Sequence, residues 1–88
     1  MTYRIVLSRP AQRALESHLP EAVAAACWEF LNGALADNPR RVGKPLRGDF
    51  EGRYSARRGE FRIIYRIVEE QVLVEVIDIR HRREVYRR

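Results

Sequence analysis

The sequence has little cysteine and almost no lysine, and it has no long hydrophobic run. A single cysteine among 88 residues, Cys27, cannot form an internal disulfide, so a secreted disulfide scaffold is excluded. No stretch approaches the roughly 18 apolar residues of a membrane span. The strand-like residues 1–7 lack the apolar region of a signal peptide. We therefore expect a single domain over residues 1–88, located in the cytoplasm and without a membrane partner.

Residues that bind metals or nucleotides are also scarce. His18, Cys27 and His81 are scattered, with no spacing typical of a zinc site. No Gly-rich turn from a strand into a helix indicates a nucleotide pocket. We expect no metal and no cofactor.

Arginine, by contrast, is abundant and unevenly placed. Of the 17 cations, all are Arg except Lys44. Residues 1–38 hold three Arg and four acidic residues, a balance of −1, whereas residues 39–88 hold fourteen cations and eight acidic residues, a balance of +6. The planar fork of arginine suits bidentate contact with phosphate. A basic half of this kind indicates nucleic acid or an acidic protein as partner, although a solvated basic face gives the same pattern.

Two N-terminal segments have the periodicity of helices. The first starts at Ser8-Arg9-Pro10, with Ser8 or Arg9 as the N-cap. The second runs from Pro20 to about Ala36 and ends at Asp37-Asn38-Pro39. Its apolar stripe is Val23, Cys27, Phe30, Leu31 and Ala34, widened by Ala24, Trp28 and Leu35.

Period-2 alternation predicts strands at residues 3–8, 53–58, 61–68 and 72–79. In the third of these, Phe61, Ile63, Tyr65 and Ile67 face the helices, which leaves Arg62 and Arg66 on the open side. Residues 40–52 are expected to form a loop with a short extended piece, anchored by Leu46 and Phe50. The predicted fold class is α+β, with two N-terminal helices packed on one face of a small, mainly antiparallel sheet of about four strands.

Arg57, Arg62 and an arginine from 80–83 come from successive strands or their ends, so they can converge in space. The chain then ends with five Arg in nine residues around Tyr86. The alternative is structural: arginines on an open face commonly stay solvated or pair with Glu60, Glu75 or Asp78, and Tyr86 can cap the core.

Three stretches resemble the RelE/ParE toxin superfamily of bacterial toxin–antitoxin systems. They are Lys44-Pro45-Leu46-Arg47, Tyr54-x-x-Arg57-x-Gly59-x-Phe61-Arg62-Ile63-Ile64-Tyr65, and Ile79-Arg80-His81-Arg82-Arg83-Glu84-Val85-Tyr86. The resemblance implies a RelE-type mRNA interferase, which cleaves mRNA in the A site of the 70S ribosome without a metal. It also implies a RelB-like antitoxin partner in a toxin–antitoxin hetero-oligomer.

The resemblance further implies roles for single residues. Arg62 matches the arginine that stabilises charge on the reacting phosphate, and Tyr86 matches a tyrosine that stacks on or orients the substrate. Arg82, or Arg80 if the alignment gap is shifted, matches the arginine that serves the leaving 5′ oxygen. Substrate-binding candidates are Lys44, Arg47, Arg53, Arg58, Arg80 and Arg83.

The chain departs from the family pattern at two positions. Arg57 and Ser55 stand where well-studied relatives carry Lys. Because arginine stays protonated at physiological pH, Arg57 can clamp phosphate but is a poor general base, which leaves His81 and Tyr86 as candidates for proton transfer. Two other functions stay open: a ParE-like DNA gyrase inhibitor that acts by binding, and a general RNA-binding module.

Overall fold

A five-stranded sheet forms the centre of the computed structural model, which describes residues 2–81. The strand order is β1-β5-β4-β3-β2. The strands are β1 (Arg4–Leu7), β2 (Lys44–Pro45), β3 (Tyr54–Arg58), β4 (Phe61–Val68) and β5 (Leu73–His81). β1 is parallel to β5, and the other neighbours are antiparallel. The predicted α+β class is confirmed, but the expected strand count was one too low, because β2 is too short to show an alternation.

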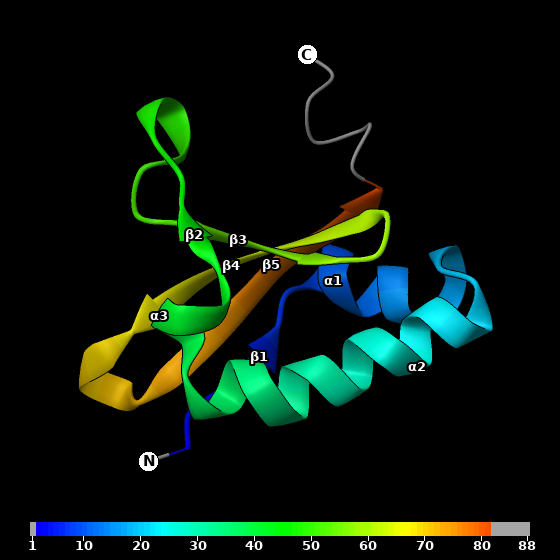
Figure 1. Cartoon of the computed structure of the whole chain (residues 1–88), viewed down its shortest axis with the longest axis horizontal. Coiled ribbons are helices and arrows are strands. Elements are labelled where there is room, and N and C mark those ends of the chain that lie inside the picture. The colour runs from blue at the N-terminus through cyan, green and yellow to red at the C-terminus, as the bar shows by residue number, and fades with distance from the viewer. Residues whose placement is uncertain (1, 82–88) are drawn as a thin grey trace.

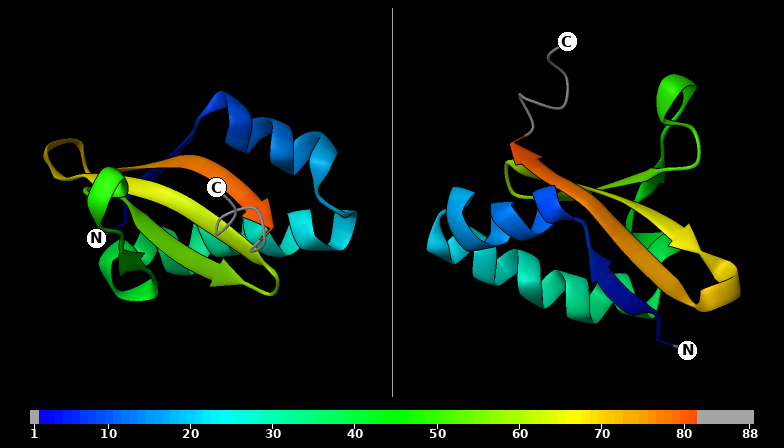
Figure 2. Two further views of the ribbon diagram at one scale, coloured as in Figure 1. Left: turned by 90° about the horizontal axis from the view of Figure 1, so that it is seen from above. Right: turned by 180° about the vertical axis from the view of Figure 1, so that it is seen from behind.

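Two helical segments cover one face of this sheet (Figure 1). The first consists of α1 (Arg9–Arg13) and the π-helical turn η1 (Ala14–His18). The second consists of α2 (Glu21–Phe30) and the π-helical turn η2 (Leu31–Leu35). The chain segment 46–53 rises on the opposite side of the sheet, as the right view of Figure 2 also shows. No helix in residues 2–81 is long and apolar enough to cross a membrane.

Ser8, one of the two predicted N-cap residues, caps the first helix. Its Oγ accepts a hydrogen bond from the Ala11 backbone N–H at 3.2 Å, and Pro10 occupies the first turn, where no backbone donor is needed. The Ser8 hydroxyl also donates to the Ile77 carbonyl of β5. The start of α1 is therefore fixed directly to the sheet.

The core lies between the second helix and the middle strands. Cys27, Phe30, Leu31 and Leu35 are buried against a sheet face that includes Ile63, Tyr65, Val74 and Val76. Each large apolar side chain buried in this way contributes about 1.5–3 kcal/mol. Ala34 and Trp28, predicted to share the stripe, are exposed instead. The wider π-helical turn after Phe30 rotates the buried face, so that Leu35, which the predicted stripe also included, is buried and Ala34 is not.

The segment after the second helix is more structured than predicted. Pro39 starts a short helix, α3 (Pro39–Val42), and its carbonyl accepts a buried hydrogen bond from the Tyr65 hydroxyl at 2.6 Å. Burial raises the pKa of Tyr65 far above its ordinary value, so the hydroxyl remains a donor. Two 3-10 turns complete the fold, η3 (Gly48–Phe50) and η4 (Glu69–Gln71).

Leu46 and Phe50, the two residues expected to anchor the loop, differ in burial. Leu46 is half-buried, but Phe50 is 40% exposed. Phe50 lies in η3, on a loop that projects from the sheet on the side away from the helices (Figure 1).

Candidate functional site

Three arginines lie side by side across the middle of the sheet. The register places Arg57 of β3 opposite Arg62 of β4, and Arg62 opposite Arg80 of β5. Side chains directly opposite on antiparallel strands have Cβ atoms about 4.5–5.5 Å apart. We call Arg57, Arg62 and Arg80 the arginine row.

The row lies on the face of the sheet away from the helices. The adjacent register line, Ala56–Ile63–Ile79, is buried in the core against the helical layer. Since successive side chains on a strand point to opposite faces, the arginine row points to the open face. Arg57 and Arg80 are exposed and Arg62 is half-buried. Figure 2, viewed from above, shows this side of β3, β4 and β5 without a covering helix.

The electrostatics of the row favour an anion. Like charges directly opposite each other destabilise a sheet, and here three guanidinium groups follow one another across three strands. A phosphate between them relieves that repulsion and offers oxygen atoms that match the guanidinium fork.

Asp78 supplies a counter-charge to one member of the row, Arg80. Its Oδ2 accepts a hydrogen bond from Arg80 Nε at 2.6 Å, and its Oδ1 accepts one from the Ile79 backbone N–H at 2.9 Å. With both oxygens engaged, the carboxylate orients the Arg80 guanidinium. Asp78 and Arg80 are two residues apart on one strand, and this spacing was the signal in the sequence that their side chains share a face and can pair.

Further cations extend the open face towards the raised loop. Lys44 of β2 is exposed and lies opposite Ser55, which alternation places on the same face as Arg57. Arg47 and Arg53 are exposed and line a pocket within the loop, together with Glu51. These three substrate-binding candidates therefore lie at the β2 and β3 edge, away from the row itself.

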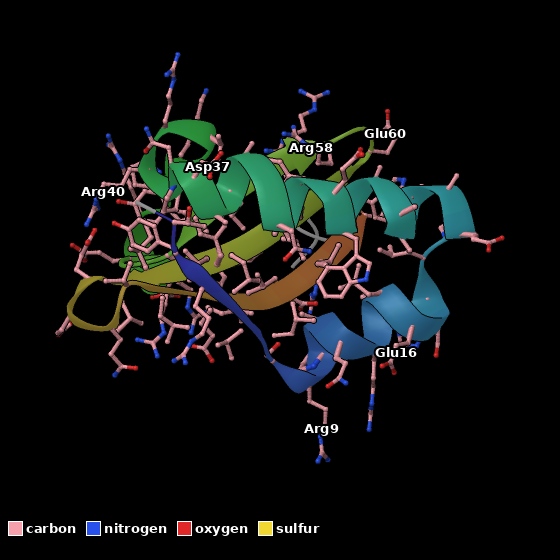
Figure 3. The ribbon with its side chains drawn as sticks, turned by 90° about the horizontal axis from the view of Figure 1, so that it is seen from below. Arg9, Glu16, Asp37, Arg40, Arg58 and Glu60 are labelled. Carbon is pink, nitrogen blue, oxygen red and sulfur yellow. The ribbon has the colours of Figure 1, made fainter. Side chains whose placement is uncertain are left out.

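Arg58 and His81, also predicted as site residues, lie on the helix side of the sheet. They share a register line with Phe61, one residue from the row. The Arg58 guanidinium lies 3.7 Å from the centre of the Phe30 ring, beside α2 (Figure 3). The His81 ring packs edge-on against Phe61, with 5.3 Å between ring centres. The structure does not bring these two side chains to the arginine row.

Arg82, Arg83 and Tyr86, the other predicted site residues, lie outside the described residues. Within residues 2–81, no cluster of three His, Cys, Asp or Glu side chains is arranged to hold a metal ion. Cys27 is fully buried, and burial raises the pKa of its thiol, which does not suit a nucleophile.

A mixed, mainly antiparallel sheet that is covered by helices on one face and basic on the other is the fold of the RelE-like toxins. The chain belongs to the family described as the ParE toxin of the type II toxin-antitoxin system, parDE, which residues 5–86 match. It is 48% identical to Toxin RelE of Mycobacterium tuberculosis over 85 residues, covering 97% of this chain and 87% of that protein. It is 43% identical to Toxin RelG of the same organism over 88 residues, covering both chains completely.

A solved structure agrees with these relatives. The toxin–antitoxin complex RelBE2 from Mycobacterium tuberculosis contains a chain that superposes with a TM-score of 0.87 at 41% identity, covering 92% of each chain.

Proposed function

We propose that this toxin is a ribosome-dependent endoribonuclease that acts in the cytoplasm, cleaves mRNA in the A site of the 70S ribosome and thereby inhibits translation. The observation that carries the proposal is the arginine row on the open face of the sheet. The relative named Toxin RelE supports it.

In the proposed reaction the ribose 2′-OH attacks the adjacent phosphorus, and the bond to the 5′ oxygen breaks. The products are a 2′,3′-cyclic phosphate and a 5′-OH. Arg62, the central and half-buried member of the row, stabilises the charge that develops on the phosphate oxygens. Arg57 and Arg80 hold the phosphate from either side, which positions it for in-line attack.

Proton transfer is assigned to the C-terminal residues. Tyr86 is proposed to orient the substrate and take part in proton transfer, and Arg82 to serve the leaving oxygen. His81 packs against Phe61 on the opposite face of the sheet, which favours Tyr86 over His81 for the chemical step.

A RelB-like antitoxin is the proposed partner, in a toxin–antitoxin hetero-oligomer. The RelBE2 structure pairs a similar toxin with an antitoxin, which supports this assignment. An acidic or amphipathic antitoxin segment over the helices or the basic face would neutralise the toxin.

The second candidate is inhibition of DNA gyrase by binding, and the match of residues 5–86 to a family named for ParE favours it. Purified toxin added to programmed ribosomes, and separately to gyrase with DNA, distinguishes the two candidates. Cleaved mRNA with a 2′,3′-cyclic phosphate supports the nuclease. Intact mRNA together with stalled gyrase complexes contradicts it.

Binding to programmed ribosomes should weaken steeply with salt. One phosphate at the arginine row and one each at the exposed Arg47 and Arg53 make three contacts to a single strand, which give a log–log slope of about −2 and about a 20-fold loss of affinity between 50 and 200 mM salt. Equilibrium binding measured over this range checks the expectation, with Arg53→Gln as the matched variant, whose slope should be smaller. A flat response would point to a protein target.

Exchanging Asp78 for asparagine should separate binding from cleavage. The change removes a negative charge beside the row, so RNA should bind slightly more tightly. It also removes the charged acceptor that orients Arg80, so single-turnover cleavage should slow about 10-fold. In an Arg80→Ala background, Asp78→Asn should have no further effect on the rate. Equal losses in both backgrounds would exclude the positioning role.

A further inference from the structure

Phe50 is a large aromatic side chain that the fold leaves exposed. It is 40% exposed, in the 3-10 turn η3 at the tip of the loop formed by residues 46–53. This loop projects on the side of the sheet that bears the arginine row, away from the helices (Figures 1 and 2). Exposing a phenyl ring to water costs free energy, which a contact with another molecule recovers.

The loop around Phe50 has a defined shape. Its base is closed by the Leu46 N–H, which donates to the Arg53 carbonyl at 2.8 Å, and its tip by the Glu51 N–H, which donates to the Gly48 carbonyl at 3.1 Å. Gly48 and Gly52 have φ angles of 67° and 93°, a region that glycine adopts without strain. The backbone therefore holds Phe50 in a defined, hydrogen-bonded turn.

The charges beside Phe50 identify the kind of partner. Arg47 and Arg53 flank it in the chain and line a pocket in the same loop. An aromatic ring between cations is the pattern by which proteins hold single-stranded nucleic acid: the bases stack on the ring and the cations contact the phosphates. Arg53 and Arg57 are four residues apart, about 13 Å at ~3.3 Å per residue. A few nucleotides of one strand span that distance and reach the row.

We propose that the loop of residues 46–53 is a nucleobase-stacking arm, in which Phe50 stacks on a base of the RNA strand whose phosphate lies at the arginine row. Arg47 and Arg53 contact the phosphates on either side of that base. The inference rests on the proposed function, since it takes the bound strand to be RNA.

The test measures binding of a fluorescently labelled 12-nucleotide single-stranded RNA at low salt. Phe50→Ala and Phe50→Leu should each weaken binding about 10-fold, whereas Phe50→Trp should retain it, because tryptophan keeps an aromatic face and leucine does not. The salt slope should stay unchanged in all three variants, since phenylalanine releases no counterion. Arg47→Gln should instead lower the slope.

A second experiment uses a set of RNAs, each with a single abasic site at a different position. At the position that stacks on Phe50, loss of the base should weaken binding by the wild type but not by Phe50→Ala. Thermal unfolding of each variant checks that the exposed position leaves stability unchanged. If Phe50→Leu bound RNA with wild-type affinity, base stacking on Phe50 would be disproved. The nuclease proposal would be unaffected, because the cleavage assay tests it separately. Weaker antitoxin binding with unchanged RNA binding would assign Phe50 to a protein contact and also overturn it. A wild type that binds no RNA overturns the arm, whereas the nuclease proposal is decided separately by the cleavage assay on programmed ribosomes.

Discussion

Replacing Arg62 by alanine should reduce mRNA cleavage about 10²–10³-fold, the usual loss on removal of one transition-state charge donor. Arg62 is the central member of the arginine row, opposite both Arg57 and Arg80. Its half-buried position limits competition from water, which strengthens its interaction with a developing oxyanion. The variant should still fold and bind antitoxin. Single-turnover cleavage on programmed ribosomes measures the effect.

Arg66→Ala is the matched control for this experiment. Arg66 lies on the same strand and, by alternation, the same face, but it is bound to Glu75 at 2.7 Å. Exposed ion pairs of this kind contribute about 0–1 kcal/mol, so the rate should change little. Arg62→Lys should recover part of the activity, because it restores the charge without the planar fork. Full cleavage by well-folded Arg62→Ala would disprove the assignment of Arg62.

Gly43→Ala should destabilise the protein by about 3 kcal/mol, through overpacking and a disturbed buried hydrogen bond. A Cβ at this position would lie 2.1 Å from the Tyr65 hydroxyl oxygen and 3.1 Å from the Ser55 carbonyl oxygen. The Tyr65 hydroxyl cannot move away without losing its hydrogen bond to Pro39. The midpoint of thermal unfolding should fall by about 15 °C for a domain of this size.

Gly33→Ala is the control for the glycine change. A Cβ at Gly33, in η2, meets nothing within 4 Å, and alanine is favoured over glycine in a helix by about 0.5–1 kcal/mol. Its unfolding midpoint should stay level or rise. Tyr65→Phe added to Gly43→Ala removes the closest clashing atom, so the double variant should lose less stability than the two single changes together. Strict additivity would show that the contact with Tyr65 is not the cause.

Most of the fold could be predicted because its signals are local. The cap at Ser8, the end of the second helix before Pro39 and the alternation along residues 61–68 each depend on neighbouring residues. The exceptions have non-local causes. The two-residue strand β2 exists through pairing with β3, and the π-helical turn η2 turns Ala34 out of the buried stripe while Leu35 stays in it.

The candidate site was harder to predict, because the number of charged residues does not specify the face of the sheet to which each side chain points. The alternation of β4 placed Arg62 on the open face, and the order of the strands predicted that Arg57 and one arginine from 80–83 can converge with it. Arg57 and Arg58 are adjacent in sequence, yet one belongs to the row and the other stacks on Phe30. The same division separates Arg80 from His81.

By itself, therefore, the sequence determined the α+β class, the helical layer and a basic second half rich in arginine. Those features follow from residue type and short-range periodicity. The tertiary structure decided which three arginines lie side by side, that Phe50 is exposed, and that Gly43 meets Tyr65. The physical reason is strand register: a shift of one residue turns a side chain to the other face, and pairing between strands distant in sequence sets that register.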